Sequence, residues 1–212
     1  SAQKGNLSLV KNKKKWITFV GKLNKAKGYD VFSSAIIDVL NKNKDWKAKI
    51  IGDEKREKII LNHKNADLLG FKKHSEVINI FKKSSIAVVC SRWEEPLGRT
   101  SLEASANGCA VVITNKGGLP ETVTNAKILK NLSSSELKKI LNSLIKNNTL
   151  RKSLQKLSIK NFYLTHFFVT KNIDNYRKEK LQSINNFFTP RKKFKMRILH
   201  ITNFNERLDG RL

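Results

Sequence analysis

The sequence has few acidic residues, cysteines and prolines. Of its 212 residues, 17 are Asp or Glu and 43 are Lys or Arg, so that the formal net charge is +26. The lysines are spread over the whole length, with short clusters at 11–15 and 191–195, and no aromatic pattern typical of single-strand nucleic-acid binders accompanies them. The charge leaves three interpretations open: a lysine-rich solvated surface, attraction to an anionic membrane surface, or binding to nucleic acid.

Long apolar runs and metal-ligand patterns are also missing. No run approaches the ~18 apolar residues of a membrane span, and residues 1–15 lack the apolar core of a signal peptide. We therefore expect a cytoplasmic protein, with peripheral contact at the inner membrane face as one interpretation of the charge. Cys90 and Cys109 lack metal-ligand spacing and are expected in the core of a protein from a reducing compartment. The four histidines are scattered and no Asp-x-Asp motif occurs, so we expect no metal.

Short apolar runs alternate with helical patterns along the first two thirds of the chain. Strands are predicted at 16–20, 47–51, 67–71, 86–90, 110–113 and 126–129. Helices are predicted at 31–40, around 54–62, from a cap at Ser75 to Phe81, after Gly98, and from Pro120. Strands that alternate with helices form a mostly parallel sheet. The sequence thus predicts an α/β fold, a Rossmann-like three-layer sandwich with a helical C-terminal region.

The helical C-terminal region begins at Ser133, which we expect to form a capping box with Glu136. Further helices are predicted at 149–161 and 166–188, which ends a first domain at 1–188. Residues 189–212 are predicted to form a basic linker followed by an isolated strand, Met196 to Thr202. That strand could open a further domain, join the edge of the main sheet, or stay disordered.

Two lysines follow the first predicted strand. Lys22 and Lys27 lie in a loop between Gly21 and Gly28, at the carboxyl end of that strand. Two cations held there suit a diphosphate, whose negative charge rises when it departs as a leaving group. The alternative is that they are two of many surface lysines.

The second group of candidate residues lies between Ser91 and Gly118. Glu95 and Glu103 are separated by seven residues, and a carboxylate pairs well with vicinal hydroxyls of a sugar or ribose. Glu103 has small or apolar neighbours, which is unusual for a solvated charge, whereas Glu94 lacks the spacing. The amides of a predicted helix start would point at an anion; they belong to Gly98, Arg99 and Thr100.

A double glycine, Gly117-Gly118, precedes Leu119-Pro120-Glu121 and allows close backbone approach to a ligand. An ordinary strand-to-helix turn is the alternative.

These segments together resemble a known family. The runs G-K-L-N-K-A-K-G, L-L-G-F, S-R-W-E-E-P-L-G-R-T-S-L-E-A-S-A-N-G and G-G-L-P-E-T-V occur in this order between Trp16 and Phe188. In order and spacing they are similar to the C-terminal, nucleotide-sugar-binding domain of glycosyltransferase family four. The resemblance implies a retaining enzyme with two facing Rossmann-like domains, the GT-B architecture.

The resemblance also implies roles for single residues. Glu95 would bind the hydroxyls of the transferred sugar, Glu103 the ribose hydroxyls, and Lys27 the diphosphate. Lys22 stands where the family usually has arginine, so the charge is kept and the bidentate fork is lost. The remaining positions would complete the donor site: Gly21 in the lysine loop, the amides of Gly98, Arg99 and Thr100 on the distal phosphate, and Phe71 beside the base.

At the level of the whole protein, the resemblance implies transfer of a sugar from a UDP- or GDP-linked donor, without a cofactor. The acceptor would be a glycan or a lipid-linked molecule in cell-surface polysaccharide synthesis. The acceptor-binding domain, which normally precedes residue 1, is expected elsewhere, and the strand at 196–202 resembles the start of such a domain. The helix from His166 resembles the segment that crosses back to the partner domain. Two alternatives stay open, a non-catalytic sugar-nucleotide-binding subunit and a basic nucleic-acid-binding α/β module.

Overall fold

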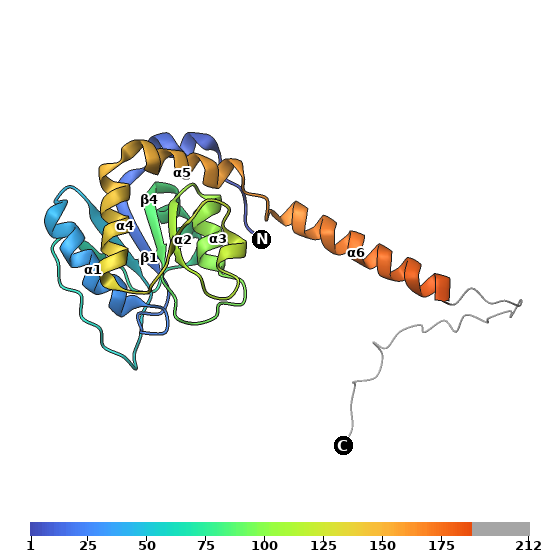
Figure 1. Cartoon of the computed structure of the whole chain (residues 1–212), viewed down its shortest axis with the longest axis horizontal. Helices are drawn as coiled ribbons and strands as arrows, with labels where there is room; N and C mark the ends of the chain where they lie inside the picture. Colours follow the sequence, from blue (N-terminus) through green and yellow to red (C-terminus); the bar gives the residue numbers. More distant parts are fainter. Residues whose placement is uncertain (188–212) are drawn as a thin grey trace, which may run out of the picture. The chain divides into compact units, whose positions relative to one another are not determined.

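The computed structural model describes residues 1–187, which form six strands, six α-helices and two short 3-10 helices (Figure 1). The chain divides into a unit of Ser1–Thr170 and a second unit that begins at Lys171, within the last helix. The predicted basic linker and the predicted strand Met196–Thr202 lie outside the described residues.

All neighbouring strands of the sheet run parallel, in the order β3-β2-β1-β4-β5-β6. The strands are β1 (Lys14–Val20), β2 (Lys47–Ile51), β3 (Ala66–Leu68), β4 (Ser84–Val89), β5 (Ala110–Thr114) and β6 (Lys127–Leu129). The order reverses between β1 and β4, and in such sheets ligands bind in the crevice at the carboxyl ends of these two strands. The prediction of a Rossmann-like fold is confirmed.

Helices cover both faces of the sheet. They are α1 (Tyr29–Lys42), α2 (His74–Lys83), α3 (Arg99–Ala106), α4 (Ser134–Lys146), α5 (Asn148–Lys160) and α6 (His166–Phe187), with the 3-10 helices η1 (Leu7–Asn12) and η2 (Pro120–Thr122). Figure 1 shows α1 and α4 on one side of the sheet and α2 and α3 on the other. Among the residues that the structure describes, none of the helices is both long and apolar enough to cross a membrane.

The two faces of the sheet bury alternate residues of the same strand. In β4, Ile86 and Val88 pack with α1 and α4, whereas Ala87 and Val89 pack with α2 and α3. This alternation follows from the pleat of a strand. All six residues of β4 are buried because helices cover both faces, and the strand therefore shows no polar alternation in the sequence.

The apolar stripe predicted for the first helix is confirmed in α1. Its inward residues are all buried: Val31, Phe32, Ala35, Ile36, Val39 and Leu40. Burial of a large apolar side chain contributes roughly 1.5–3 kcal/mol, so packing on the sheet, more than intrinsic propensity, holds this helix in place.

The helix predicted around Glu54–Asn62 is wrong. The segment after β2 has no regular secondary structure and is mostly exposed. Ile59 and Leu61 pack on the core, but two apolar residues do not make a helical stripe. The carboxylates of Glu54 and Glu57 instead accept hydrogen bonds from the loop that follows β1.

Two predicted helix starts are also corrected, and at a third the helix begins where predicted with a different bonding pattern. α2 begins at His74 with Lys73 as the N-cap, so Ser75 is not a cap. At Pro120 the chain forms only the short η2. The box at Ser133 is half formed: its hydroxyl accepts from the Glu136 amide at 3.2 Å, while the Glu136 carboxylate accepts from the amides of residues 130 and 131.

The first thirteen residues, for which we predicted no structure, form η1 and contain a half-buried lysine. The ammonium of Lys13 donates to the carbonyl oxygens of Phe81 at 2.8 Å and Asn107 at 2.6 Å. Burial lowers the pKa of Lys13. Both cysteines are buried as expected, and burial raises the pKa of the Cys90 thiol to about 12.

Gly28 joins the loop after β1 to α1 and lies against the end of β4. Its φ is +71°, and an added Cβ would lie 1.9 Å from the carbonyl oxygen of Cys90. Because β1 and β4 are neighbours in the sheet, neither backbone can easily move away. Only glycine fits this close approach.

We expect Gly28→Ala to lower the free energy of unfolding more than Gly70→Ala does. Gly70 has a similar φ of +64°, but an added Cβ would have no heavy atom within 4 Å. Gly70→Ala should therefore cost only the conformational penalty of about 1–2 kcal/mol. Gly28→Ala should cost at least about 3 kcal/mol because overlap with the Cys90 carbonyl is added. Urea denaturation measures both, and equal losses would show that this carbonyl imposes no constraint.

Candidate functional site

A small crevice lies where the strand order reverses. Its volume is about 110 Å³, and its walls come from β1, β4, the loops that follow them and the start of α3. Six of the nine predicted site residues line it: Gly21, Lys27, Glu95, Gly98, Arg99 and Thr100. Sequence reasoning placed these residues on separate loops, and the parallel sheet brings the loops to the same edge.

Lys27 and Glu95 form an ion pair across this crevice. The side chain of Lys27 is 32% exposed and that of Glu95 is 15% exposed, so the pair lies at the mouth of the crevice rather than on the open surface. The Glu95 carbonyl oxygen accepts from the amide of Gly118 at 2.6 Å. The double glycine thus fixes the backbone of the glutamate that precedes it by more than twenty residues.

The start of α3 forms one wall of the crevice. Gly98 is the N-cap, so the amides of Arg99 and Thr100 belong to the first turn, where amides have no partner inside the helix. The hydroxyl of Ser101 donates to the Gly98 carbonyl at 2.7 Å and lies 2.7 Å from the Thr122 hydroxyl, which holds this turn in place. A helix start of this kind favours an anion.

Glu103 lies one turn further along α3 and lines a second, larger cavity of about 560 Å³. Its side chain is 9% exposed. The carboxylate accepts from Arg99 Nε at 2.7 Å and pairs with His74 Nε2 at 2.9 Å. Arg99 lines both cavities, so the two are adjacent. Burial of Glu103 agrees with the expectation from its apolar neighbours.

His74 is a residue of this cavity that sequence reasoning missed. It opens α2 and reaches Glu103 from another element, twenty-nine residues away in the chain. Residues 1–6 form another wall of the same cavity. Neither contact leaves a local pattern in the sequence, because both depend on how separate segments pack.

Two predicted site residues lie outside both cavities. Lys22 is exposed and lines neither of them, and Phe71 is 77% exposed and lines neither. Glu94, expected to be a solvated neighbour, accepts from Lys116 Nζ at 2.8 Å and from the Gly117 amide at 2.5 Å. These bonds, first the one from Lys116, lower the pKa of Glu94.

The chemistry of the two cavities is complementary. The crevice offers a lysine and helix-start amides, which suit phosphate oxygens, together with a carboxylate that accepts from hydroxyls. The larger cavity offers a second carboxylate beside an arginine and a histidine. Within the part of the chain that the structure describes, no cluster of three or more His, Cys, Asp or Glu could hold a metal ion.

Known proteins share this sequence pattern and fold. Residues 6–161 match the family described as Glycosyl transferases group 1. An uncharacterized glycosyltransferase of Methanocaldococcus jannaschii is 35% identical over 145 residues, which cover 64% of this chain and 40% of that protein. The chain spans 34%, 40% and 45% of the lengths of three curated relatives, less than half of each.

Solved structures agree with the fold. The C-terminal domain of a glycosyl transferase group 1 family protein from Francisella tularensis matches with a TM-score of 0.62 and 25% identity, over 74% of this chain and 91% of that one. Anabaena HepE in complex with UDP-glucose matches with a TM-score of 0.66 and 20% identity, over 85% of this chain and 54% of that one, which bears on the fold alone. The family match covers well over half of the chain and includes both loops of the crevice and α3, and this chain therefore belongs to the Glycosyl transferases group 1 family.

Proposed function

We propose that this chain binds a nucleotide-diphosphate sugar and supplies the donor half of a retaining glycosyltransferase of family four. The observation that carries the proposal is the meeting of Lys27, Glu95 and the start of α3 at the reversal point of the sheet. A sugar linked to a diphosphate presents both phosphate oxygens and hydroxyls, so it uses both kinds of group at once. The retaining outcome rests on the family resemblance.

In this proposal the diphosphate lies between Lys27 and the amides of Gly98, Arg99 and Thr100. These groups would stabilise the negative charge that develops as the diphosphate departs. Lys22 is exposed and outside the crevice, so its proposed contact with the diphosphate requires a movement of the loop after β1. Gly21 lets the backbone of that loop approach the ligand.

Glu95 would bind hydroxyls of the transferred sugar, and Glu103 the hydroxyls of the ribose. The larger cavity, which Glu103 lines, is of the size of a small-molecule site. We propose UDP- or GDP-linked sugars as donors, and the UDP-glucose complex of Anabaena HepE makes uridine the first to test. Phe71 is exposed and lines neither cavity, so its proposed place beside the base also requires a movement.

The acceptor and the partner domain belong to the same proposal. We propose a glycan or lipid-linked acceptor of cell-surface polysaccharide synthesis, on the family resemblance. In α6, Ile173, Tyr176 and Ile184 are 46%, 60% and 50% exposed and fall on one face of the helix. This face suits packing against an acceptor-binding domain. We propose a cytoplasmic protein, and the net charge of +26 supports its contact with an anionic membrane surface.

We expect Lys27→Ala to weaken binding of UDP by about 10- to 100-fold, since a hydrogen bond to a charged group contributes about 1.5–3 kcal/mol. It should weaken binding of inorganic pyrophosphate similarly. Glu103→Gln should weaken UDP about tenfold and leave pyrophosphate unchanged, because its proposed partner is the ribose. Isothermal titration calorimetry of the wild type and both variants, with each of the two ligands, measures these six affinities.

The matched control is Lys15→Ala. Lys15 also pairs with a carboxylate, Asp45, but lies at the opposite end of β1. Lys15→Ala should leave the affinities for UDP and for pyrophosphate unchanged. Equal binding by the wild type, Lys27→Ala and Glu103→Gln would contradict the site. Salt-sensitive binding to mixed-sequence DNA that UDP does not displace would favour the nucleic-acid alternative.

Glu95→Gln should reduce the preference for UDP-glucose, or for the best of a panel of UDP- and GDP-linked sugars, over the bare diphosphate. The neutral amide removes the ionised acceptor of sugar hydroxyls, a loss of about tenfold for the sugar-bearing ligand. It also releases Lys27 from its partner, so affinity for bare UDP should not fall. Competition titrations give the ratio of the two affinities, and a proportional loss for both ligands would show that Glu95 does not contact the sugar.

A further inference from the structure

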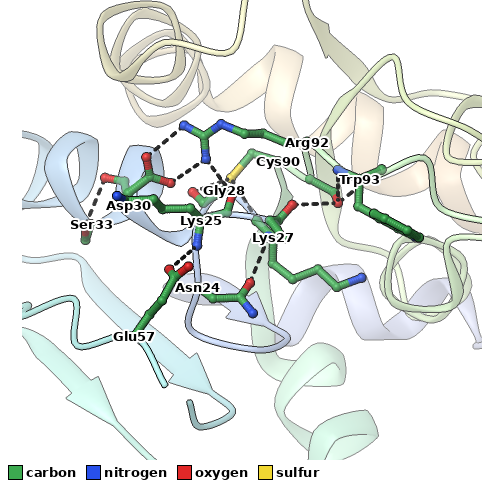
Figure 2. A network of polar contacts seen from close by, with 12 residues as sticks. Asn24, Lys25, Lys27, Gly28, Asp30, Ser33, Glu57, Cys90, Arg92 and Trp93 are labelled. Atoms are coloured by element: carbon green, nitrogen blue, oxygen red, sulfur yellow. Dashed lines mark hydrogen bonds and ion pairs between the residues drawn. The ribbon is translucent and has the colours of Figure 1, made fainter. Parts of the chain in front are cut away.

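The loop that carries Lys27 is held from two sides by charged side chains of other strand ends (Figure 2). Residues 21–28 form bends and turns rather than regular helix or strand. A loop of this kind places a side chain reproducibly only when its backbone is fixed by other contacts. The position of the lysine in the crevice therefore depends on groups that surround the loop.

Arg92, from the loop after β4, supplies the first set of contacts. Its guanidinium donates to both carboxylate oxygens of Asp30, at 2.6 and 2.8 Å, and to the carbonyl oxygen of Lys25 at 2.5 Å. Its backbone amide donates to the carbonyl oxygen of Ala26 at 2.9 Å. Arg92 thus binds the chain immediately before Lys27 and, through Asp30, the first turn of α1 immediately after it.

Two glutamates of the segment after β2 supply the second set. Glu57 accepts from the Lys25 amide at 2.8 Å. Glu54 accepts from the side-chain amide of Asn24 at 2.9 Å, and the carbonyl oxygen of that side chain accepts from the Lys27 amide at 3.1 Å. The backbone of Lys25 is therefore held at its N–H by a glutamate and at its carbonyl by Arg92.

Arg92 stands behind the loop rather than in the crevice. The residues that line the crevice include Lys27, Ser91 and Glu95 but not Arg92. In Figure 2 the side chain of Lys27 extends away from the pair of Arg92 and Asp30. A group bound in the crevice would thus meet the lysine and not the arginine.

We propose that Arg92 is a positioning residue that holds Lys27 in the crevice. Its guanidinium binds the Lys25 carbonyl and the Asp30 carboxylate at the same time, an arrangement called the fork below. The inference rests on the proposed function, because it gives Lys27 the diphosphate as its partner. An arginine suits this role better than a lysine, since a lysine ammonium cannot hold both carboxylate oxygens in a planar fork and also reach the carbonyl.

The fork keeps its charge over the working range of pH. Burial opposes ionisation of Asp30, but the hydrogen bond and charge of Arg92 prevail and lower the pKa of Asp30. A carboxylate with a lowered pKa in the folded protein contributes its stabilisation above the ordinary value of about 4. The contribution is lost only as pH falls below that value, so the fork is complete at neutral pH.

A double-mutant cycle on the full chain tests the proposal. Arg92→Ala should weaken UDP binding by about 5- to 10-fold, and Arg92→Lys by less. In the Lys27→Ala background, Arg92→Ala should change the affinity less than about twofold, because the residue through which it acts is gone. An equal loss in both backgrounds, or no loss in the wild type, would overturn the proposal. A general loss of stability would weaken both backgrounds alike.

The matched control is Lys138→Ala, which removes another ion pair of α1, to Asp38 at 2.7 Å. This pair lies outside the loop and should leave UDP binding unchanged. Amide hydrogen exchange of residues 22–28, measured without nucleotide, gives a second readout. Exchange should be faster in Arg92→Ala and unchanged in Lys138→Ala. Unchanged exchange in Arg92→Ala overturns the proposal even if UDP does not bind, whereas failure of the wild type to bind any nucleotide contradicts the proposed function alone.

Discussion

The close approach of two backbones, at Gly28 and Cys90, is the constraint on which the rest of the site depends. β1 and β4 are adjacent parallel strands, and the two loops that leave them must diverge to opposite faces of the sheet. The loop after β1 turns into α1 while still touching the end of β4. This contact sets the distance between the lysine of one loop and the glutamate of the other, so the crevice is a consequence of strand order.

Acidic side chains hold much of the backbone around the crevice, although they are scarce in this basic chain. Only 17 of 212 residues are acidic, yet several surround the crevice and hold its backbone. Glu54 and Glu57 bind the loop after β1, Asp30 binds Arg92, and Glu94 binds the turn at Gly117. Carboxylates accept strongly from amides and guanidinium groups. Each of these carboxylates is therefore bound by a donor near the crevice, although the protein as a whole is strongly basic.

The sequence predicted those features that depend on local pattern and on strand order. Uninterrupted apolar runs marked the buried strands, and Gly98 marked a turn followed by a helix. The helix expected at Glu54–Asn62 failed because its glutamates bind a neighbouring loop, a tertiary contact that no periodicity reveals. The roles of His74 and Arg92 were not predicted for the same reason. Each side chain contacts a residue that is distant in the chain and close only after folding.

Among the residues that the structure describes, Arg99 alone lines both cavities, and its side chain also binds Glu103. Fragments of a ligand that occupied the two cavities separately would therefore share a neighbour, and each would alter the affinity of the other. Such coupling is reciprocal by thermodynamic linkage. A pyrophosphate and a nucleoside added together should consequently not bind as two independent molecules, and the size of their mutual effect would report how rigidly the guanidinium is held.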